Sequence, residues 1–356
     1  MLTIVLSNVP TIIAVVVVLG VLVFIHEAGH FLMARAVGIG VHEFSLGFGP
    51  RLWGIKRGKS AYNLRAVPLG GFVRLIGMDP DDPERDQPYS FARKPVLSRL
   101  AVITAGPAMN FVLAVVAIAV IAFSQGIPEV IVPQVAKVLP GYPAVAAGIK
   151  EGDRILAVDG QRVTRSEEVS TRLGENPGRE KVLTVERKGR QLKVAVLPRV
   201  EADGKGKVGI EIGDKVLAYR KINGVEALGQ GVQYTGMVTG LIAGFIRDVF
   251  IGAAPTDEIS GPVRVIAYIG QAAKHGLLYL VEMVAFLSIN VGFFNLLPIP
   301  ALDGARIGFL AWEGVTRHPI DPAKENMVHL FGFGILILLM VAVTYHDILQ
   351  LSAGVK

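Results

Sequence analysis

An apolar run from Val15 to Arg35 contains His26, Glu27 and His30 in the pattern His-Glu-x-x-His. On a helix, residues four positions apart share a face, so the two imidazoles can bind one metal ion while Glu27 lies alongside as a base. The pattern is a signature of metallohydrolases. Ionisable side chains inside a membrane-length apolar run are costly and usually mark a functional site. The sequence therefore predicts a metal centre within a membrane helix.

Two simpler explanations of this motif exist. A histidine within a membrane can be a hydrogen-bonded packing residue, and His-Glu-x-x-His on a soluble amphipathic helix is often only a polar face. The i, i+4 spacing and the position inside the apolar run favour a metal centre instead. So does Asp303, a possible third ligand far along the chain.

The composition indicates a polytopic membrane protein. The chain has 356 residues, of which 51% are hydrophobic and 19% charged, and its mean hydropathy is +0.50. The net charge of +6 lies largely beside apolar spans, so it indicates membrane topology and contact with lipid, not nucleic-acid binding. The absence of cysteine excludes thiolate zinc sites, so any metal must be bound by His, Asp or Glu.

Four apolar segments are long enough to cross a bilayer, at about 9–33, 100–123, 277–312 and 330–349. The first basic residue is Arg35, so the first segment lacks the basic region of a cleavable signal peptide and should remain as a transmembrane helix. Lys and Arg are frequent from there to Arg99, which makes this loop cytoplasmic by the positive-inside rule. We therefore expect both termini outside and the histidines near the cytoplasmic face.

Two features lie close to this predicted site. The loop from Phe44 to Leu75 is rich in glycine and aromatic residues, which predicts one or two β-hairpins at the membrane that could pair with an extended substrate strand. A plain connecting loop is the alternative. The second span begins with Gly106, Pro107 and Asn110; small residues permit close helix packing, whereas Asn110 needs a polar partner at membrane depth.

Residues 126–223 alternate apolar and polar positions and carry many charges, as expected outside the membrane. Glycine turns separate a short helix around Pro143 to Ala147 from a strand over Arg154 to Val158. A further helix and a hairpin turning at Lys188-Gly189 follow. The pattern resembles a bacterial PDZ domain, in which a loop and a sheet edge bind a peptide terminus by strand addition.

The remainder of the chain is predicted to return to the membrane. Residues 224–276 have apolar positions at helical spacing broken by charges, which indicates amphipathic helices at the membrane surface, with a membrane hairpin as the alternative. In the third span, Pro298 and Pro300 break the helix just before Asp303. Non-helical backbone at membrane depth is tolerated where it is buried in protein or lines a wet cavity. We therefore expect Asp303 at the site, level with His26.

These patterns predict a polytopic α-helical membrane protein of about four transmembrane helices, with a membrane-associated β-hairpin region and an inserted α/β PDZ-like domain. The expected units are 1–125 with the first two spans and the hairpin, the PDZ-like domain at 126–223 on the extracytoplasmic side, the surface helices at 224–276, and the last two spans at 277–356.

Three strings occur in the order HEAGH, GPAMN and NLLPIPALDG. With the PDZ-like insert, they resemble the site-2 protease family of intramembrane zinc metalloproteases, of the bacterial RseP/RasP type, over nearly the whole chain. The resemblance implies a membrane-reentrant hairpin in the first cytoplasmic loop. Some relatives carry two PDZ domains, whereas one is legible here. The resemblance assigns zinc binding to His26, His30 and Asp303, acid/base catalysis to Glu27, and substrate holding to Asn295 and Asn110.

The resemblance implies a zinc endopeptidase of the bacterial inner membrane that cleaves transmembrane segments, such as those of single-pass anti-sigma factors or remnant signal peptides. The alternatives are a metal-binding membrane protein without protease activity, either a transporter or a chaperone-like homologue, and a PDZ scaffold anchored by its helices. A transporter needs polar residues through the outer membrane half, where the first and last spans are apolar. Neither alternative explains Asp303 at the depth of the histidines.

Overall fold

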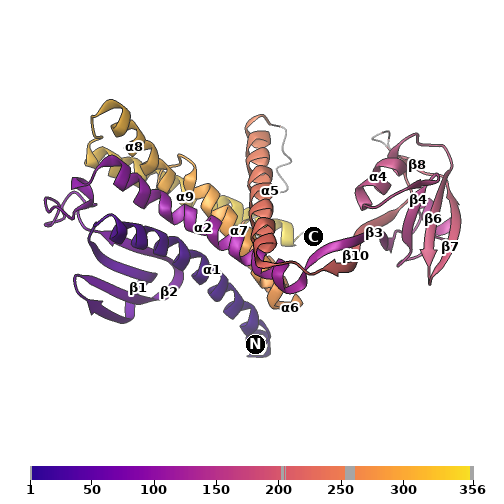
Figure 1. Cartoon of the computed structure of the whole chain (residues 1–356), viewed down its shortest axis with the longest axis horizontal. Helices are drawn as coiled ribbons and strands as arrows, with labels where there is room; N and C mark the ends of the chain where they lie inside the picture. The colour runs from indigo at the N-terminus through magenta and orange to yellow at the C-terminus, as the bar shows by residue number, and fades with distance from the viewer. Residues whose placement is uncertain (1, 202–203, 205, 253–260, 353–356) are drawn as a thin grey trace. The chain divides into compact units, whose positions relative to one another are not determined.

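The computed structural model describes residues 2–201, 204, 206–252 and 261–352 (Figure 1). The chain forms two compact units. Unit 1 comprises Met1–Ala122 and Gly224–Lys356, and unit 2 comprises Phe123–Asn223.

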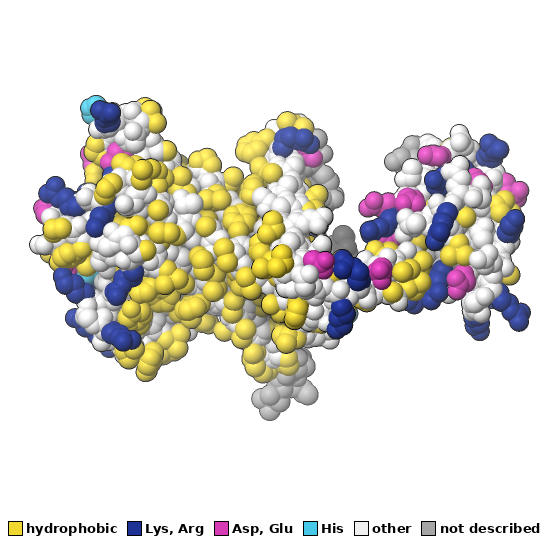
Figure 2. All heavy atoms as spheres, in the orientation of Figure 1, with side chains coloured by type: hydrophobic (Ala, Val, Ile, Leu, Met, Phe, Trp, Pro, Cys, Tyr) yellow, Lys and Arg dark blue, Asp and Glu magenta, His cyan; other side chains and the backbone are white. Residues whose placement is uncertain are grey.

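In the described part of the chain, four helices are long and apolar enough to cross a membrane. They are α1 (Leu2–Ala36), α2 (Val96–Gln125), α7 (Leu277–Leu296) and α9 (Pro322–Ser352). Figure 2 shows apolar side chains over most of the helical face of unit 1. Such a surface suits lipid and not water, so the predicted polytopic membrane protein is confirmed.

The chain between α1 and α2 forms an antiparallel hairpin of β1 (Val41–Arg57) and β2 (Ser60–Leu75). β2 bends at Gly70, whose φ of 122° favours glycine. Because of this bend, residues 43–46 pair with residues 61–64 on one side and with residues 71–74 on the other. The last stretch of β2 is thus a sheet edge with no second strand partner among the described residues.

The far part of the hairpin exposes both apolar and basic side chains. Leu52, Trp53 and Ile55 are each more than half exposed, and Lys and Arg gather over this end of unit 1 in Figure 2. Exposed apolar groups beside cations match the interface between lipid tails and headgroups. The region has the surface expected of a membrane-associated hairpin.

Non-helical chain separates α7 from α8 (Asp303–Thr316), as the prolines predict. Leu297 is extended because the ring of Pro298 disfavours helical backbone at the residue before it. We expected the span to continue almost to Asp303, but residues 297–302 are not helical. A turn over these six residues therefore carries the chain from the end of α7 to Asp303.

Two further helices of unit 1 are α5 (Gly224–Phe250) and α6 (Pro262–His275). Neither is among the candidate spans found in the described residues. The buried carboxylate of Asp347 in α9 accepts hydrogen bonds from the backbone N–H groups of Gly261 and Arg264, each 3.1 Å long. It thereby supplies acceptors that the start of α6 would otherwise lack. The location of α5 and α6 at the membrane surface stays a prediction.

Unit 2 has the predicted PDZ-like architecture. Its main sheet has the order β10-β3-β4-β6-β7, with β5 paired to β4, and α3 and α4 contribute Ala144, Val169 and Leu173 to the core on the sheet. β10 is an edge strand beside a groove of about 780 Å³, to which α4 contributes Leu173. The elements are β3 (Ile127–Val138), α3 (Pro143–Ala146), β4 (Arg154–Val158), β5 (Gln161–Arg162), α4 (Ser166–Gly174), β6 (Lys181–Arg187), β7 (Arg190–Val196), β8 (Arg199–Val200), β9 (Gly206–Lys207) and β10 (Ile210–Arg220).

Candidate metal centre

Two helices distant in sequence bring three potential metal donors together. α1 presents His26 and His30 on one face, as the i, i+4 spacing predicts, and α8 begins with Asp303. Oδ2 of Asp303 lies 3.1 Å from Nε2 of His26 and 3.4 Å from Nε2 of His30. The two Nε2 atoms are 3.2 Å apart. These three residues can therefore hold one metal ion.

The spacing of the donor atoms fits zinc. Ligand bonds of about 2.0–2.1 Å in a tetrahedron put ligand atoms about 3.3–3.4 Å apart, close to all three distances here. His26 and His30 are each 9% exposed, and within the described part of the chain the buried Oδ2 of Asp303 has no hydrogen-bond partner. An unpaired buried carboxylate oxygen is costly unless a cation neutralises it. Two histidines and one carboxylate leave a fourth position open, as in catalytic zinc sites.

α2 fixes the ring of His30 in position and in protonation state. Nδ1 lies 2.9 Å from the carbonyl oxygen of Val102, so Nδ1 carries the proton and donates to it. Nε2 then keeps its lone pair for a metal. A Cβ atom on Gly106 would lie only 2.3 Å from Nε2 of His30. Glycine at this position is therefore required for the ring to lie where it does.

Asn110 supports the other histidine ring. It is fully buried, and its Nδ2 lies 3.0 Å from Nδ1 of His26. Binding of a metal through Nε2 leaves the proton on Nδ1, which then needs an acceptor. The nitrogen and the oxygen of a side-chain amide are assigned from the surrounding hydrogen bonds. Rotation of the Asn110 amide by half a turn exchanges these two atoms, and the unpartnered Oδ1 then accepts the hydrogen bond from Nδ1 of His26. The family resemblance assigns substrate holding to Asn110; the structure places its side chain against the ring of His26, and Asn110 is not among the residues that line the cavity.

Asn110→Ala is expected to lower zinc affinity by about 10–100-fold, the usual effect of removing a group that orients a metal ligand. Competition with a chelator in detergent measures the affinity. Asn290→Ala is the matched control, because the Asn290 amide donates to the Phe286 carbonyl within α7 and lies outside the cavity wall. Unchanged affinity for Asn110→Ala would show that Asn110 only fills space.

Glu27 lies beside the three donors in the wall of a cavity of about 810 Å³. The edge stretch of β2 reaches it, because the backbone of Val73 is hydrogen-bonded to Glu27. A Cβ atom on Gly71 would lie 2.9 Å from Cγ1 of Val23 and 3.3 Å from Cγ of Glu27. The missing side chain at Gly71 thus lets a free strand edge lie alongside the acid.

Asn295 lies in the wall of the same cavity. Its Nδ2 donates to the carbonyl oxygen of Val291, 2.9 Å away and one turn earlier in α7. This bond fixes the side chain and leaves its Oδ1 to face other groups. Asn295 therefore lines the cavity with one amide atom bonded within α7.

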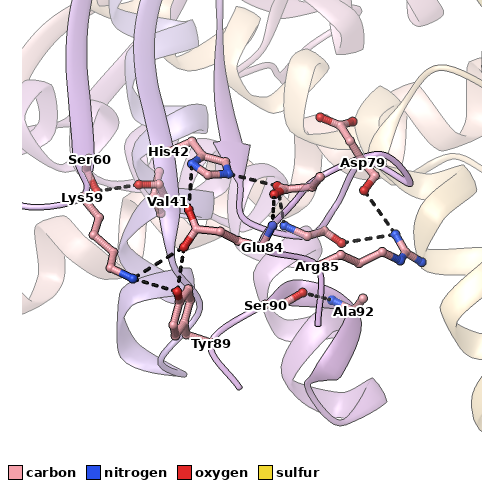
Figure 3. Close-up of polar contacts among 12 residues, drawn as sticks. Val41, His42, Lys59, Ser60, Asp79, Glu84, Arg85, Tyr89, Ser90 and Ala92 are labelled. Atoms are coloured by element: carbon pink, nitrogen blue, oxygen red, sulfur yellow. Dashed lines mark hydrogen bonds and ion pairs between the residues drawn. The ribbon is translucent and has the colours of Figure 1, made fainter. Parts of the chain in front are cut away.

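A polar network holds the base of the hairpin against the following loop (Figure 3). The carboxylate of Asp82 accepts hydrogen bonds of 2.8 Å from the backbone N–H groups of Gly77 and Glu84, and lies 3.0 Å from Nε2 of His42. Burial raises the pKa of Asp82, but these hydrogen bonds outweigh it and lower the pKa below its ordinary value. Glu84 in turn accepts a bond of 2.6 Å from the hydroxyl of Tyr89. The network fixes the end of β2 next to the cavity.

Three parts of this site were absent from the sequence prediction. They are the carbonyl of Val102, the contact of Gly106 with the His30 ring, and His329 in the cavity wall. Only His329 gave a signal, as an ionisable residue at the start of an apolar span. The other two depend on how closely α2 approaches α1.

Two histidines on a membrane-spanning helix, with a glutamate between them and an aspartate from a short helix beside them, form the architecture of a membrane metalloprotease. The sequence matches Peptidase family M50 over residues 14–339. The chain belongs to this family, and it is a zinc metalloendopeptidase. The family resemblance and the zinc cofactor predicted from the sequence are thereby confirmed.

Two relatives cover almost the whole chain. It is 32% identical to the zinc metalloprotease RasP of Geobacillus kaustophilus, across 96% of this chain and 98% of that protein. It is 31% identical to the regulator of sigma-W protease RasP of Bacillus subtilis, across 96% and 99%. A crystal structure of the PDZ domain of the SdrC-like protein from Listeria monocytogenes is also similar, at 20% sequence identity and a TM-score of 0.21. The match covers 22% of this chain and 85% of that chain.

Proposed function

We propose that the protein cleaves transmembrane segments of other membrane proteins inside the bilayer. In this proposal His26, His30 and Asp303 bind the zinc ion, and Glu27 is the catalytic acid/base. The observation that carries the proposal is the tetrahedral spacing of the three buried donor atoms, with Glu27 beside them, in a bundle of membrane-spanning helices.

The chemistry follows from the groups that surround the cavity. Zinc, when bound, supplies a Lewis acid that polarises the scissile carbonyl and activates water. The carboxylate of Glu27 takes a proton from the attacking water and delivers it to the leaving amide nitrogen. With Nδ1 of His30 donating to the carbonyl of Val102, and Nδ1 of His26 donating to the turned amide of Asn110, both Nε2 lone pairs would be left for the metal. The products are two shorter membrane peptides.

A transmembrane helix hides its carbonyl groups in internal hydrogen bonds, so the substrate must unwind before attack. The edge of β2 beside Glu27 offers backbone groups with which an extended substrate can pair. Asn295 lies in the same cavity wall and would hold the extended segment. Strand pairing and this amide together compensate for the lost helical hydrogen bonds.

Charge distribution supports an orientation in the bacterial inner membrane. The basic residues between α1 and α2, including those exposed on the hairpin, favour a cytoplasmic location for this loop. Both termini and unit 2 are then extracytoplasmic, and the catalytic site is near the cytoplasmic face. Measured accessibility of single cysteines on either side of the membrane, introduced into this cysteine-free chain, tests the orientation.

The substrates proposed are single-pass membrane proteins of the anti-sigma factor type and remnant signal peptides. A relative named for regulation of sigma-W makes the first class relevant. Unit 2 would filter them, because the groove between β10 and α4 fits an added peptide strand with a free terminus. Deletion of residues 126–223 is expected to permit cleavage of untrimmed substrates, measured by gel shift in proteoliposomes. Unchanged selectivity would contradict the filter.

The decisive experiment uses the purified full chain in proteoliposomes with a single-span fusion protein. Mass spectrometry of the products is expected to place the cut within the apolar segment. A chelator should stop cleavage, and added zinc should restore it. Cleavage only outside the apolar segment would contradict proteolysis within the membrane, and zinc flux without cleavage would favour a transporter.

A further inference from the structure

His329 of α9 lines the cavity without belonging to the three donors. Its Nδ1 accepts a hydrogen bond of 2.9 Å from the backbone N–H of Ala301. A neutral imidazole carries one proton, so the proton is on Nε2. Nε2 is buried and has no hydrogen-bond partner among the residues that the structure describes. Oε1 of Glu325 is 3.8 Å away, beyond hydrogen-bond distance.

The ring of His329 is held in place from several sides. Ala301 has a φ of 75°, a strained conformation for a residue with a side chain, and its N–H is fixed by this ring. One turn further along α9, a Cβ atom on Gly332 would lie 2.1 Å from Cβ of Pro300, so helix and turn are in direct contact. The ring of Phe309 meets the imidazole edge to face at 5.8 Å. Rotation of the ring to find another partner would break these contacts.

An unpaired donor in a buried position lowers stability, because the group has lost water without gaining a partner. Such a group is expected to meet a partner that enters the cavity from outside the chain. An unwound transmembrane segment brings matching groups, since each broken helical turn exposes backbone carbonyl oxygens that also lack water.

We propose that Nε2–H of His329 donates a hydrogen bond to a backbone carbonyl oxygen of the extended substrate in the cavity. The inference rests on the proposed function and adds a substrate-binding residue on α9 to it. α9 thereby has two roles: Nδ1 holds the turn that leads to Asp303, and Nε2 holds the substrate.

Two amide substitutions separate these roles. His329→Asn retains an acceptor near the position of Nδ1 but no donor at Nε2, whereas His329→Gln retains a donor near Nε2 and no acceptor at Nδ1. The probe is a leucine-rich phosphinic peptide, a tetrahedral mimic of the cleaved bond, whose Kd is measured by calorimetry on the zinc-loaded full chain in detergent. Zinc content and the melting temperature of each variant are measured in parallel.

The expected result is a Kd at least about tenfold higher for His329→Asn, with normal zinc content, and a Kd near the wild-type value for His329→Gln. His346→Asn is the control, since His346 is exposed on the same helix and lies outside the cavity wall. Binding by His329→Asn that is as tight as binding by His329→Gln would overturn the inference and leave His329 as an anchor of the turn. No binding to the wild-type protein would overturn the proposed function itself.

Discussion

Glu27→Gln is expected to reduce the cleavage rate by about 10²–10⁴-fold while zinc content stays at the wild-type level. The amide has nearly the same shape as the carboxylate but cannot accept a proton from water. The three metal donors are on other residues, and Gln can still meet the backbone of Val73. The rate is measured with a single-span substrate in detergent, and zinc by mass spectrometry of the purified protein.

The contrast between rate and metal content is the discriminating result. A protein that only transports or stores zinc would keep its function in Glu27→Gln. Glu151→Gln serves as control, since Glu151 is exposed in a turn of unit 2. Turnover that survives Glu27→Gln would exclude Glu27 as the acid/base, and loss of zinc would show that Glu27 acts on the metal instead.

Gly106→Ala is expected to abolish cleavage through loss of zinc, although Gly106 itself binds nothing. The added Cβ would lie 2.3 Å from Nε2 and 2.5 Å from Cε1 of His30. The ring cannot retreat along its plane without losing the hydrogen bond from Nδ1 to the carbonyl of Val102. Displacement of a ligand should exceed the loss of an orienting group, so zinc affinity should fall by more than about 100-fold.

The measurement is zinc affinity by chelator competition, together with helix content and thermal stability in detergent. Gly20→Ala is the matched control, because a Cβ on Gly20 of α1 meets nothing within 4 Å. A folded Gly106→Ala protein with normal zinc affinity would mean that α1 and α2 can separate to accommodate a methyl group. The structure argues against this, since a Cβ on Gly29 would lie 2.3 Å from the carbonyl oxygen of Ala105.

Much of the fold could be predicted because its signals are local. Apolar length defines the spans, the i, i+4 spacing puts His26 and His30 on one face, and alternation with glycine turns defines the strands of unit 2. The prolines at 298 and 300 correctly marked a break before Asp303. Pro298 disfavours helical backbone at Leu297, so α7 ends directly before the first of these prolines.

The sequence allowed prediction of the candidate metal donors, but not of the groups that hold the histidine rings in place. His26, His30, Glu27 and Asp303 are chemically conspicuous in an apolar sequence, so they were found as candidates. Asn110 was conspicuous too, yet its partner could not be read from the sequence. A buried amide needs a polar partner, but periodicity does not say whether this is a substrate or a ring on the neighbouring helix.

The sequence by itself determined that this chain spans a membrane, carries an inserted PDZ-like domain and contains candidate metal-binding side chains near its first and third apolar segments. Only the tertiary structure decided that Asp303 meets both histidines, that α2 selects the tautomer of His30, and that a free strand edge lies beside Glu27. The physical reason is the distance along the chain over which each effect acts. Burial and periodicity act within one element, whereas donor distances near 3 Å depend on how closely separate elements pack, which glycines such as Gly71 and Gly106 permit.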